Sequence, residues 1–326
     1  MRRLRARAES WPIAGAFTIA RGSKIEARVV VVEIADGEAT GRGEATPYAR
    51  YGETVEGVIA GIEGVADEIS AGLDRAALQD RLPPGAARNA LDCALWDLES
   101  RRVGQPVWRL AGLPSPRPVK TCFTLSLDTP ERMAQAAQAN AHRPWLKLKI
   151  GQAGDLDRLQ AVHAAAPNPR LVVDANEGLS FDDLRRLAPE CRRLGVVLIE
   201  QPLPAGEDAA LEGWDSPVTL CADESLHTRA ELAACARRYG AVNIKLDKAG
   251  GLTEAMALAA EARALGLQVM VGCMVATSLA MAPAMLLAGQ AEVVDLDGPL
   301  LLARDRVPGL RFEGSTVYPP AHELWG

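Results

Sequence analysis

Residues 195–202, GVVLIEQP, contain a short run of Val, Leu and Ile that opens on Gly195 and ends at the charged Glu200. A run of this length, rich in β-branched residues and bounded by Gly and Pro, predicts a strand that is buried on both faces. Such strands occur in parallel sheets whose faces are covered by helices. The fold class therefore depends on whether the same unit recurs along the chain.

Seven more apolar runs follow this pattern from residue 119 onward. Each is rich in Val, Ile and Leu and ends in polar or small residues: VKTCFTLS, WLKLKIG, RLVVDAN, VTLCADES, AVNIKLD, LQVMVGCM and AEVVDLD. Landmark residues in successive runs lie 22 to 27 residues apart, which is the length of one strand plus one helix. Between two of the runs, residues 180–195 show a helical period with Ser180 as the expected N-cap. Eight strands that alternate with helices predict a closed parallel barrel.

The prolines of LPSPRPVK mark a domain boundary near residue 113. Residues 1–112 combine alternating strand patterns with helices that begin near Thr54 and Gly85, which predicts an α+β domain. Residues 113–302 are expected to form the barrel. The final residues, about 303–326, show no helical period, so we expect the last barrel helix to be missing and the tail to be free to return to the first domain.

The composition limits the classes of function. The chain has 326 residues, of which 48% are hydrophobic and 24% charged, and a formal net charge of −6. Its one basic cluster, Arg2 to Arg7, alternates with other residues as a strand would, which argues against nucleic acid as a partner. No apolar run of about 18 residues and no secretion signal occurs, so we expect neither a membrane span nor export, and the expected compartment is the cytoplasm. The six cysteines and four histidines lack the spacing of disulfides or zinc sites.

Carboxylates stand at the ends of three consecutive predicted strands: Asp174, Glu200 and Asp223. In parallel barrels the side chains at the C-terminal ends of the strands converge on one mouth. Like charges held this close repel strongly, so a cation is implied. Oxygen ligands of this kind favour Mg²⁺. The alternative is that one carboxylate caps the next helix and another pairs with a lysine.

Lysines flank these carboxylates on two sides. Lys147 and Lys149 share one face of the second strand, and Lys245 ends the sixth strand near Lys248, with Asp247 on the same face as Lys245. A lysine in a partly desolvated site near a metal ion has a lowered pKa and becomes a usable base. One lysine would remove the proton next to a metal-bound carboxylate and the opposite lysine would return one, which inverts the stereocentre. The alternative is that the lysines form structural ion pairs.

The motifs KLK, DAN, EQP, ADES and NIKLDKAGG, in this order and spacing, resemble the muconate-lactonizing branch of the enolase superfamily over essentially the whole chain. The resemblance implies an α/β fold, a modified TIM barrel of the (β/α)7β type with an α+β capping domain over its mouth. It also implies that the three carboxylates are Mg²⁺ ligands and that Lys149 and Lys245 are the two acid/base residues. Lys147 resembles the residue that contacts the substrate carboxylate and lowers the pKa of Lys149.

Two further motifs resemble substrate-binding elements of dipeptide epimerases. Asp295 and Asp297 in DLDGP form a second acidic pair, like the Asp-x-Asp element that binds the free α-amino group of a dipeptide. An Asp-Gly-Pro turn would explain Asp297 but not Asp295. FTIARGSK resembles the loop in which an arginine faces the glutamate carboxylate of the substrate; Arg21 matches it, and Lys24 is a second candidate. The resemblance adds as weaker substrate contacts Thr124, Cys273, Met274 and Val275.

The resemblance thus implies a Mg²⁺-dependent isomerase that interconverts L-Ala-L-Glu and L-Ala-D-Glu through a metal-stabilised enolate, in murein peptide turnover. Lys149 would act on the D-Glu epimer and Lys245 on the L-Glu epimer. The expected partner is a small dipeptide, and a homo-oligomer is compatible with the sequence. Alternatives stay open: an epimerase for other side chains, o-succinylbenzoate synthesis, cycloisomerisation, N-acylamino acid racemisation, or metal-dependent binding without turnover. Asp295 and Asp297 argue against substrates that lack an ammonium group.

Overall fold

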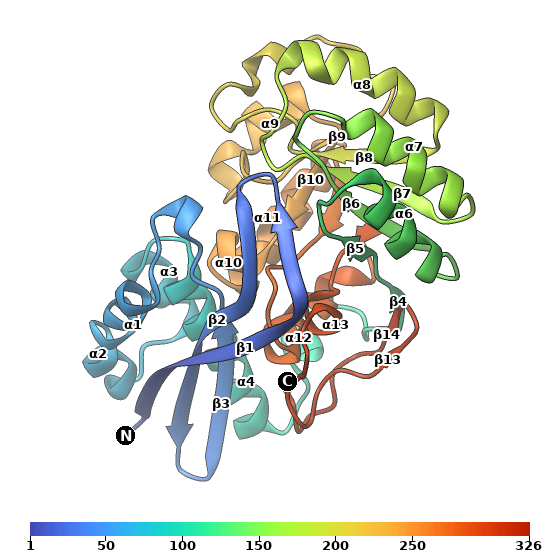
Figure 1. Ribbon diagram of the computed structural model, residues 1–326. Helices are drawn as coiled ribbons and strands as arrows, with labels where there is room; N and C mark the ends of the chain where they lie inside the picture. The colour runs from blue at the N-terminus through green and yellow to red at the C-terminus, as the bar shows by residue number, and fades with distance from the viewer.

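A computed structural model describes all residues, 1–326, and shows an antiparallel N-terminal sheet beside a curled parallel sheet (Figure 1). The N-terminal sheet has the order β1–β2–β3. Its elements, with the helices that follow, are β1 (Arg3–Ile19), β2 (Gly22–Asp36), β3 (Ala39–Ala45), the 3-10 turn η1 (Ala49–Tyr51), α1 (Val55–Glu63), α2 (Ala66–Ala71), α3 (Arg75–Arg81), α4 (Ala86–Val103) and α5 (Val107–Leu110). The strand predicted from the alternating arginines and the helices predicted near Thr54 and Gly85 are confirmed.

Glycines let α4 lie directly on the N-terminal sheet. A Cβ atom on Gly43 would stand 2.1 Å from the carbonyl oxygen of Ala90, and one on Gly41 would stand 2.1 Å from that of Ala94. No side chain fits in that space, so the two glycines of β3 are required by the close approach. Alternate residues of β2 then complete an apolar core with α4.

The barrel consists of eight parallel strands in sequential order. They are β5 (Phe123–Leu125), β6 (Trp145–Lys149), β7 (Arg170–Asp174), β8 (Val196–Glu200), β9 (Thr219–Ala222), β10 (Ala241–Ile244), β11 (Gln268–Val271) and β12 (Val293–Val294). The first and last strands meet through the backbone amide of Cys122, which donates to the carbonyl oxygen of Val294 over 2.8 Å. The predicted modified TIM barrel is confirmed.

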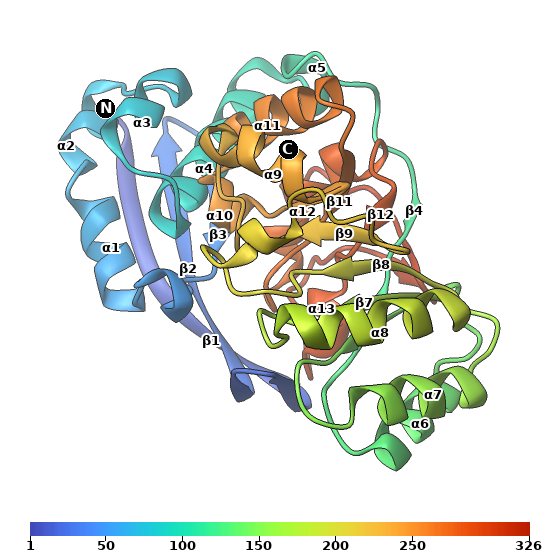
Figure 2. The same cartoon turned by 90° about the horizontal axis from the view of Figure 1, so that it is seen from above.

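The helices lie around the strands, with α6, α7 and α8 along one side and α9 and α11 along another (Figure 2). They are α6 (Pro130–Ala139), α7 (Asp155–Ala165), α8 (Phe181–Arg193), α9 (Leu232–Arg238), α10 (Leu246–Ala249), α11 (Leu252–Ala264) and α12 (Ser278–Ala288), with 3-10 turns η2 (Asp208–Leu211) and η3 (Arg229–Glu231). Helix α8 has the predicted N-cap, Ser180, in a capping box with Asp183. The connection from β8 to β9 differs from the strand-plus-helix pattern, because it contains only η2.

The first apolar run is split between two sheets. Residues 119–120 form β4, which pairs antiparallel with β14 (Thr316–Val317), and β14 pairs with β13 (Phe312–Glu313). Only Phe123–Leu125 enters the barrel. The expectation of one continuous strand was wrong there, because the pairing partner of its first half lies almost two hundred residues away in the chain.

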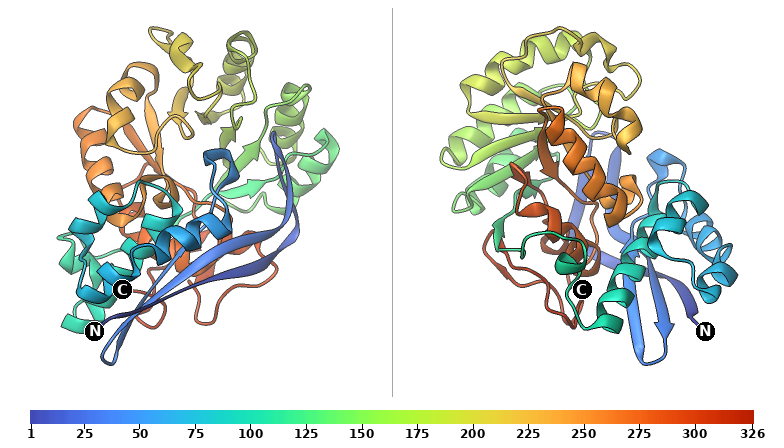
Figure 3. Two further views of the ribbon diagram at one scale, coloured as in Figure 1. Left: turned by 90° about the vertical axis from the view of Figure 1, so that its left-hand side faces the viewer. Right: turned by 180° about the vertical axis from the view of Figure 1, so that it is seen from behind.

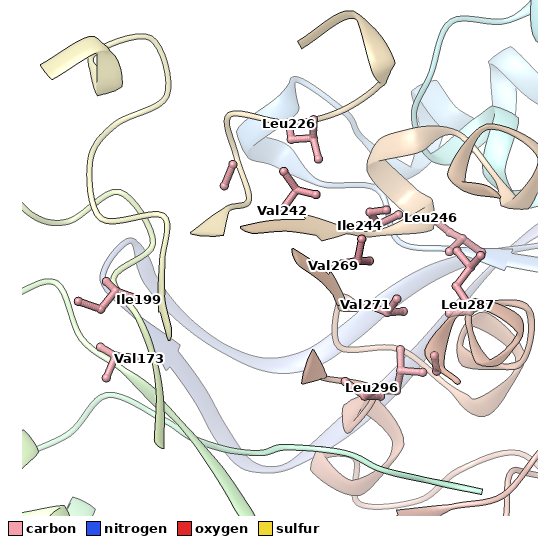
Figure 4. Close-up of a cluster of buried hydrophobic side chains, with 14 of the residues drawn as sticks. Val173, Ile199, Leu226, Val242, Ile244, Leu246, Val269, Val271, Leu287 and Leu296 are labelled. Atoms are coloured by element: carbon pink, nitrogen blue, oxygen red, sulfur yellow. The ribbon is translucent and has the colours of Figure 1, made fainter. Parts of the chain in front are cut away.

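Period-two alternation along the strands separates the inside of the barrel from its outside. Outward residues such as Val173, Ile199 and Val271 join the main core with helical residues such as Leu287 (Figure 4). The inward residues of the lower layer form a separate apolar cluster: Cys122, Val172, Leu198, Cys221, Ala241, Met270 and Val293. The residue two positions further on each strand faces the same interior, one layer higher.

The segment after β12 contains only the four-residue helix α13 (Gly298–Leu301), so no full eighth barrel helix follows. Instead the tail contacts α4 of the N-terminal domain, and the C-terminus lies beside that helix (Figure 3). The indole Nε1 of buried Trp325 donates to the carbonyl oxygen of Cys93 over 3.0 Å. The longest helix, α4, is too polar to cross a membrane, and no other helix of the chain is both long and apolar enough to do so. All six cysteines are free, as expected.

Candidate active site at the barrel mouth

The upper layer of inward-facing positions is polar, and it forms the mouth of the barrel. Seven strands contribute to it the residues two positions after the apolar layer: Thr124, Asp174, Glu200, Asp223, Asn243, Gly272 and Asp295. The remaining strand, β6, contributes Lys147 and Lys149. Every residue of this set that has a side chain is buried, and the charged ones have at most 6% of their surface exposed. The polar layer therefore holds the predicted ligands together with Lys147, and Lys149 lies two positions further along the same strand.

On the β6 side, two lysines neutralise the carboxylates. Lys149 Nζ donates to Asp174 Oδ2 over 2.6 Å. Lys147 Nζ lies 2.6 Å from Glu200 Oε2, 2.7 Å from Asp295 Oδ2 and 3.2 Å from Asp174 Oδ2. The expectation that both lysines point into the same space is confirmed. Lys147 thus occupies the centre of the acidic layer, whereas Lys149 stands at its edge.

On the β10 side, Lys245 and Lys248 meet the same layer from the opposite direction. Lys245 Nζ donates to Asp223 Oδ2 over 2.6 Å and lies 3.9 Å from Glu200 Oε1. Lys248 Nζ donates to Asp223 Oδ1 over 2.6 Å and to the carbonyl oxygen of Asn243 over 3.0 Å. Lys248 is therefore a structural partner of the Asp223 carboxylate, while Lys245 faces the mouth.

Asp247 does not share that space. Its Oδ1 accepts hydrogen bonds from the Thr46 amide over 2.8 Å and from Asn89 Nδ2 over 3.0 Å, both in the N-terminal domain. The expectation that Asp247 points the same way as Lys245 was wrong, because β10 ends at Ile244 and the chain turns into α10. Asp247 joins the two domains instead.

In the protein chain by itself, without a metal ion, the pKa values of Lys147 and Lys245 are raised. Burial disfavours the charged form of Lys147, but the carboxylates of Asp295 and Glu200 outweigh it and raise its pKa well above the usual range. Burial likewise disfavours the charged form of Lys245, but the carboxylate of Asp223 outweighs it, so the pKa of Lys245 is also raised. In return, Lys245 and Lys248 outweigh burial and hold the pKa of Asp223 well below its usual range. Lys147 and Lys245 are thus held as ammonium ions by the carboxylates.

In the protein chain by itself, no three His, Cys, Asp or Glu side chains stand close enough together to hold a metal ion, since each carboxylate turns toward a lysine. The donor chemistry nonetheless suits Mg²⁺, because oxygens come from the ends of three adjacent strands, and Asp174 and Glu200 stand opposite each other in the ladder. Glu200 Oε2 accepts no hydrogen bond although Lys147 Nζ is near it. That buried oxygen is already ion-paired with Lys147 at 2.6 Å, so a metal ion would replace or share this contact.

A residue that we did not single out from the sequence holds Glu200. Asn243 Nδ2 donates to Glu200 Oε1 over 2.7 Å from β10, which is separated from β8 by β9. The signal was present in the run AVNIKLD, where an amide interrupts an apolar strand. Gln201 holds the backbone at Asp223 rather than its carboxylate: its Oε1 accepts the amides of Asp223 and Ser225 over 2.8 and 3.0 Å.

The second acidic pair lies at the end of β12, as predicted. Asp295 is buried, with Oδ2 on Lys147 and with Oδ1 lacking any hydrogen-bond partner. Asp297 Oδ2 accepts the backbone amide of Thr124 over 2.7 Å, and burial together with Asp295 raises the pKa of Asp297 to about 7. Asp295 therefore keeps a free acceptor at the mouth. The loop after β11 adds the half-buried residues Cys273, Met274 and Val275.

The N-terminal domain covers the mouth with the tip of the β1–β2 hairpin, which reaches across to the barrel (Figure 3). Phe17 in this hairpin places its ring centroid 5.6 Å from Lys149 Nζ. Arg21, at the tip, donates to Glu177 Oε2 over 3.0 Å and to Glu224 Oε1 over 2.7 Å. Lys24 forms no ion pair and lies 5.1 Å from the ring centroid of Tyr48. Of the two candidate cations, Arg21 is already paired with protein carboxylates.

Both halves of the chain match one known family. Residues 1–112 match the N-terminal domain of mandelate racemase and muconate lactonizing enzyme, and residues 131–321 match the enolase C-terminal domain-like family. The chain belongs to the enolase superfamily. The resemblance read from the five linked motifs is thereby confirmed.

Within the superfamily, the similar proteins are epimerases and racemases. L-Ala-D/L-Glu epimerase of Escherichia coli is 48% identical over 96% of this chain and 98% of its own length. N-acetyl-D-glutamate racemase of a Pseudoalteromonas species is 45% identical over 91% of this chain and 95% of its own length. An enolase family member from Agrobacterium tumefaciens with homology to dipeptide epimerases, solved with sodium, L-Ala-L-Glu and an ordered loop, is 53% identical, with TM-score 0.98 and 100% coverage of both chains. The chain is an isomerase of this superfamily, in its dipeptide epimerase group.

Proposed function

We propose that the chain interconverts L-Ala-L-Glu and L-Ala-D-Glu by moving the α-proton of the glutamate between two lysines. The observation that carries this proposal is the placement of Lys149 and Lys245 on opposite sides of one buried carboxylate layer, on Asp174 and Asp223 respectively. A planar carbon held between them could lose a proton to one side and regain it from the other. The activity would serve murein peptide turnover, where dipeptides of this composition arise.

Asp174, Glu200 and Asp223 are proposed to hold Mg²⁺, which when bound would polarise the substrate carboxylate and so acidify the α-proton. The carboxylates would then exchange their lysine contacts for contacts with the ion. This exchange would remove the interaction that now raises the pKa of Lys245 and would make its amine available as a base. Lys147, between Glu200 and Asp295, is placed to contact the substrate carboxylate.

The ammonium group of the dipeptide is proposed to bind Asp295, whose buried Oδ1 has no partner in the chain. An unpaired buried carboxylate oxygen is costly, and a charged donor from the substrate would satisfy it. Asp297 supports this site by fixing the amide of Thr124 on the neighbouring strand. An N-acylated amino acid offers no ammonium group to Asp295.

The glutamate side chain is proposed to be read by Lys24 rather than by Arg21. Both stand in the hairpin over the mouth, but the Arg21 guanidinium already serves two carboxylates, whereas Lys24 has none. Arg21→Met should therefore affect all dipeptides alike. Lys24→Met should raise KM for L-Ala-L-Glu about tenfold while sparing L-Ala-L-Leu, as expected for loss of one charge-assisted contact.

The test is incubation of the purified protein and Mg²⁺ with dipeptides in D₂O, followed by mass spectrometry. We expect deuterium at the C-terminal residue of L-Ala-L-Glu, loss of exchange with EDTA, and recovery with added Mg²⁺. N-acetyl-L-glutamate serves as the competing substrate, because a similar relative is an N-acetyl-D-glutamate racemase. Faster exchange into N-acetyl-L-glutamate than into L-Ala-L-Glu would reject the dipeptide assignment. For the lysine variants, the matched control is Lys120→Ala, which changes an exposed surface lysine.

A further inference from the structure

We infer that Glu177 is a positioning residue that holds two separate segments of the N-terminal domain over the barrel mouth, an inference that rests on the proposed function for its catalytic consequence. The two segments are the hairpin tip around Arg21 and the segment 48–53, which contains η1. Neither segment adjoins Glu177 in the chain.

One carboxylate joins both segments. Arg50 binds Glu177 in a bidentate pair, with Nε on Oε2 and Nη2 on Oε1, both over 2.8 Å. Arg21 Nη1 reaches the same Oε2 over 3.0 Å and also the carbonyl oxygen of Asn176 over 2.6 Å. The Ala205 amide donates to Oε1 over 2.8 Å, which anchors the carboxylate to the barrel side. Bidentate arginine pairs are the strongest and most geometrically specific of such contacts.

The backbone at Asn176 and Glu177 has an energetically unfavourable conformation that orients this carboxylate. Asn176 has φ 45° and Glu177 has φ 69°, in the left-handed region that a glutamate rarely adopts. The Glu177 side chain is only 6% exposed, while Arg21 and Arg50 are 26% and 40% exposed. The carboxylate is thus the buried centre of the cluster, and the two arginines bring their loops to it.

The hairpin that Glu177 secures carries groups for the reaction. Phe17 lies over Lys149, and Ala20 packs so close to Gly151 that a Cβ there would stand 3.0 Å from the Ala20 Cβ. Releasing the hairpin would therefore disturb the cover of Lys149 and the position of Lys24, but not the strands that carry the lysines and carboxylates. Binding should suffer more than the chemical step.

The test compares Glu177→Gln with Glu190→Gln, which removes a partly exposed surface carboxylate paired with Arg193 on α8. Hydrogen–deuterium exchange of the free protein should rise in residues 14–26 and 46–54 of Glu177→Gln only. KM for every dipeptide should rise about tenfold or more, while kcat stays within about threefold. Arg50→Met should give the same pattern from the other side of the pair, and Arg50→Lys should restore part of it.

Unchanged exchange in both segments, or an equal rise throughout the barrel, would overturn the positioning role. A fall in kcat with KM unchanged would also overturn it. Because the exchange measurement needs no substrate, a protein that fails to epimerise any dipeptide would refute the proposed function while leaving the loop result intact.

Discussion

Asn243 holds Glu200 through one hydrogen bond of 2.7 Å, and it has room to do so only because the next strand presents Gly272. A Cβ on Gly272 would stand 2.5 Å from Asn243 Oδ1 and 2.7 Å from Nδ2. The glycine is thus part of the carboxylate layer, although it has no side chain. In the proposed Mg²⁺ site, these would be supporting residues of the kind that commonly set metal affinity.

Asn243→Leu should weaken Mg²⁺ binding about tenfold to a hundredfold, because the Glu200 carboxylate loses the donor that orients it. Gly272→Ala should act in the same direction by displacing the Asn243 amide. Calorimetric titration with Mg²⁺ measures both, and Asn140→Leu, at the C-cap of α6 on the outside of the barrel, is the control. Equal Mg²⁺ affinity in all four proteins would show that Asn243 does not support the ligands.

Single lysine variants should separate the two directions of proton transfer. Lys149→Ala is expected to lose exchange from L-Ala-D-Glu and Lys245→Ala from L-Ala-L-Glu, each by about a hundredfold to ten-thousandfold, as is typical for removal of a general base. Deuterium uptake of each epimer, measured separately, checks this. Equal loss from both epimers in either variant would contradict a two-base mechanism.

Asp247 should make stability fall with rising pH. Burial raises its pKa to about 7, the Thr46 and Asn89 hydrogen bonds oppose this, and Glu53 and Glu44 add to the rise. The folded protein therefore binds the proton more tightly than the unfolded chain, so the contribution of Asp247 is lost as pH rises from about 4 through 7. Urea unfolding from pH 5 to 8 should show Asp247→Asn gaining stability relative to the natural chain as pH rises.

Asp215→Asn, a change at an exposed carboxyl, serves as the control for that series. A stability difference between Asp247→Asn and the natural chain that is constant across the pH range would mean that Asp247 does not titrate with folding.

Trp325→Ala should destabilise the protein by about 3–5 kcal/mol, the usual cost of emptying a buried tryptophan site. The indole is 1% exposed and its Nε1 bonds to α4. The midpoint of urea denaturation measures the loss, and Val307→Ala, at a side chain 98% exposed in the same tail, should leave it unchanged. A small loss for Trp325→Ala would mean that the tail adds little to the joint between domains.

The sequence was sufficient for the barrel and for the charged residues of its mouth because both follow from one period. Asp174 and Glu200 are buried for the same reason that Val172 and Leu198 are, since residues two apart on a strand face the same way. The same period does not predict the pairing of Arg21 with Glu177 and Glu224. It depends on how one domain docks on the other, and no local period encodes contacts between residues more than 150 positions apart.

Local pattern also failed where a segment has a distant partner. The run from Val119 reads as one strand, yet its first half pairs with β14 and only its second half joins the barrel. Asp247 follows the same rule: its spacing from Lys245 suggested a shared face, but the turn into α10 sends it to Thr46. The period of a strand holds only as far as the strand extends.

The apolar layer beneath the carboxylates limits the directions from which a substrate can reach the site. Seven side chains, from Cys122 to Val293, fill the barrel below the mouth, so the site has a floor and substrate cannot pass through. Substrate and product would therefore enter and leave on the same side, at the barrel mouth under the hairpin that carries Phe17 and Lys24. In the proposed reaction, substrate and product would therefore both have to pass this hairpin, so its movement would bear on turnover.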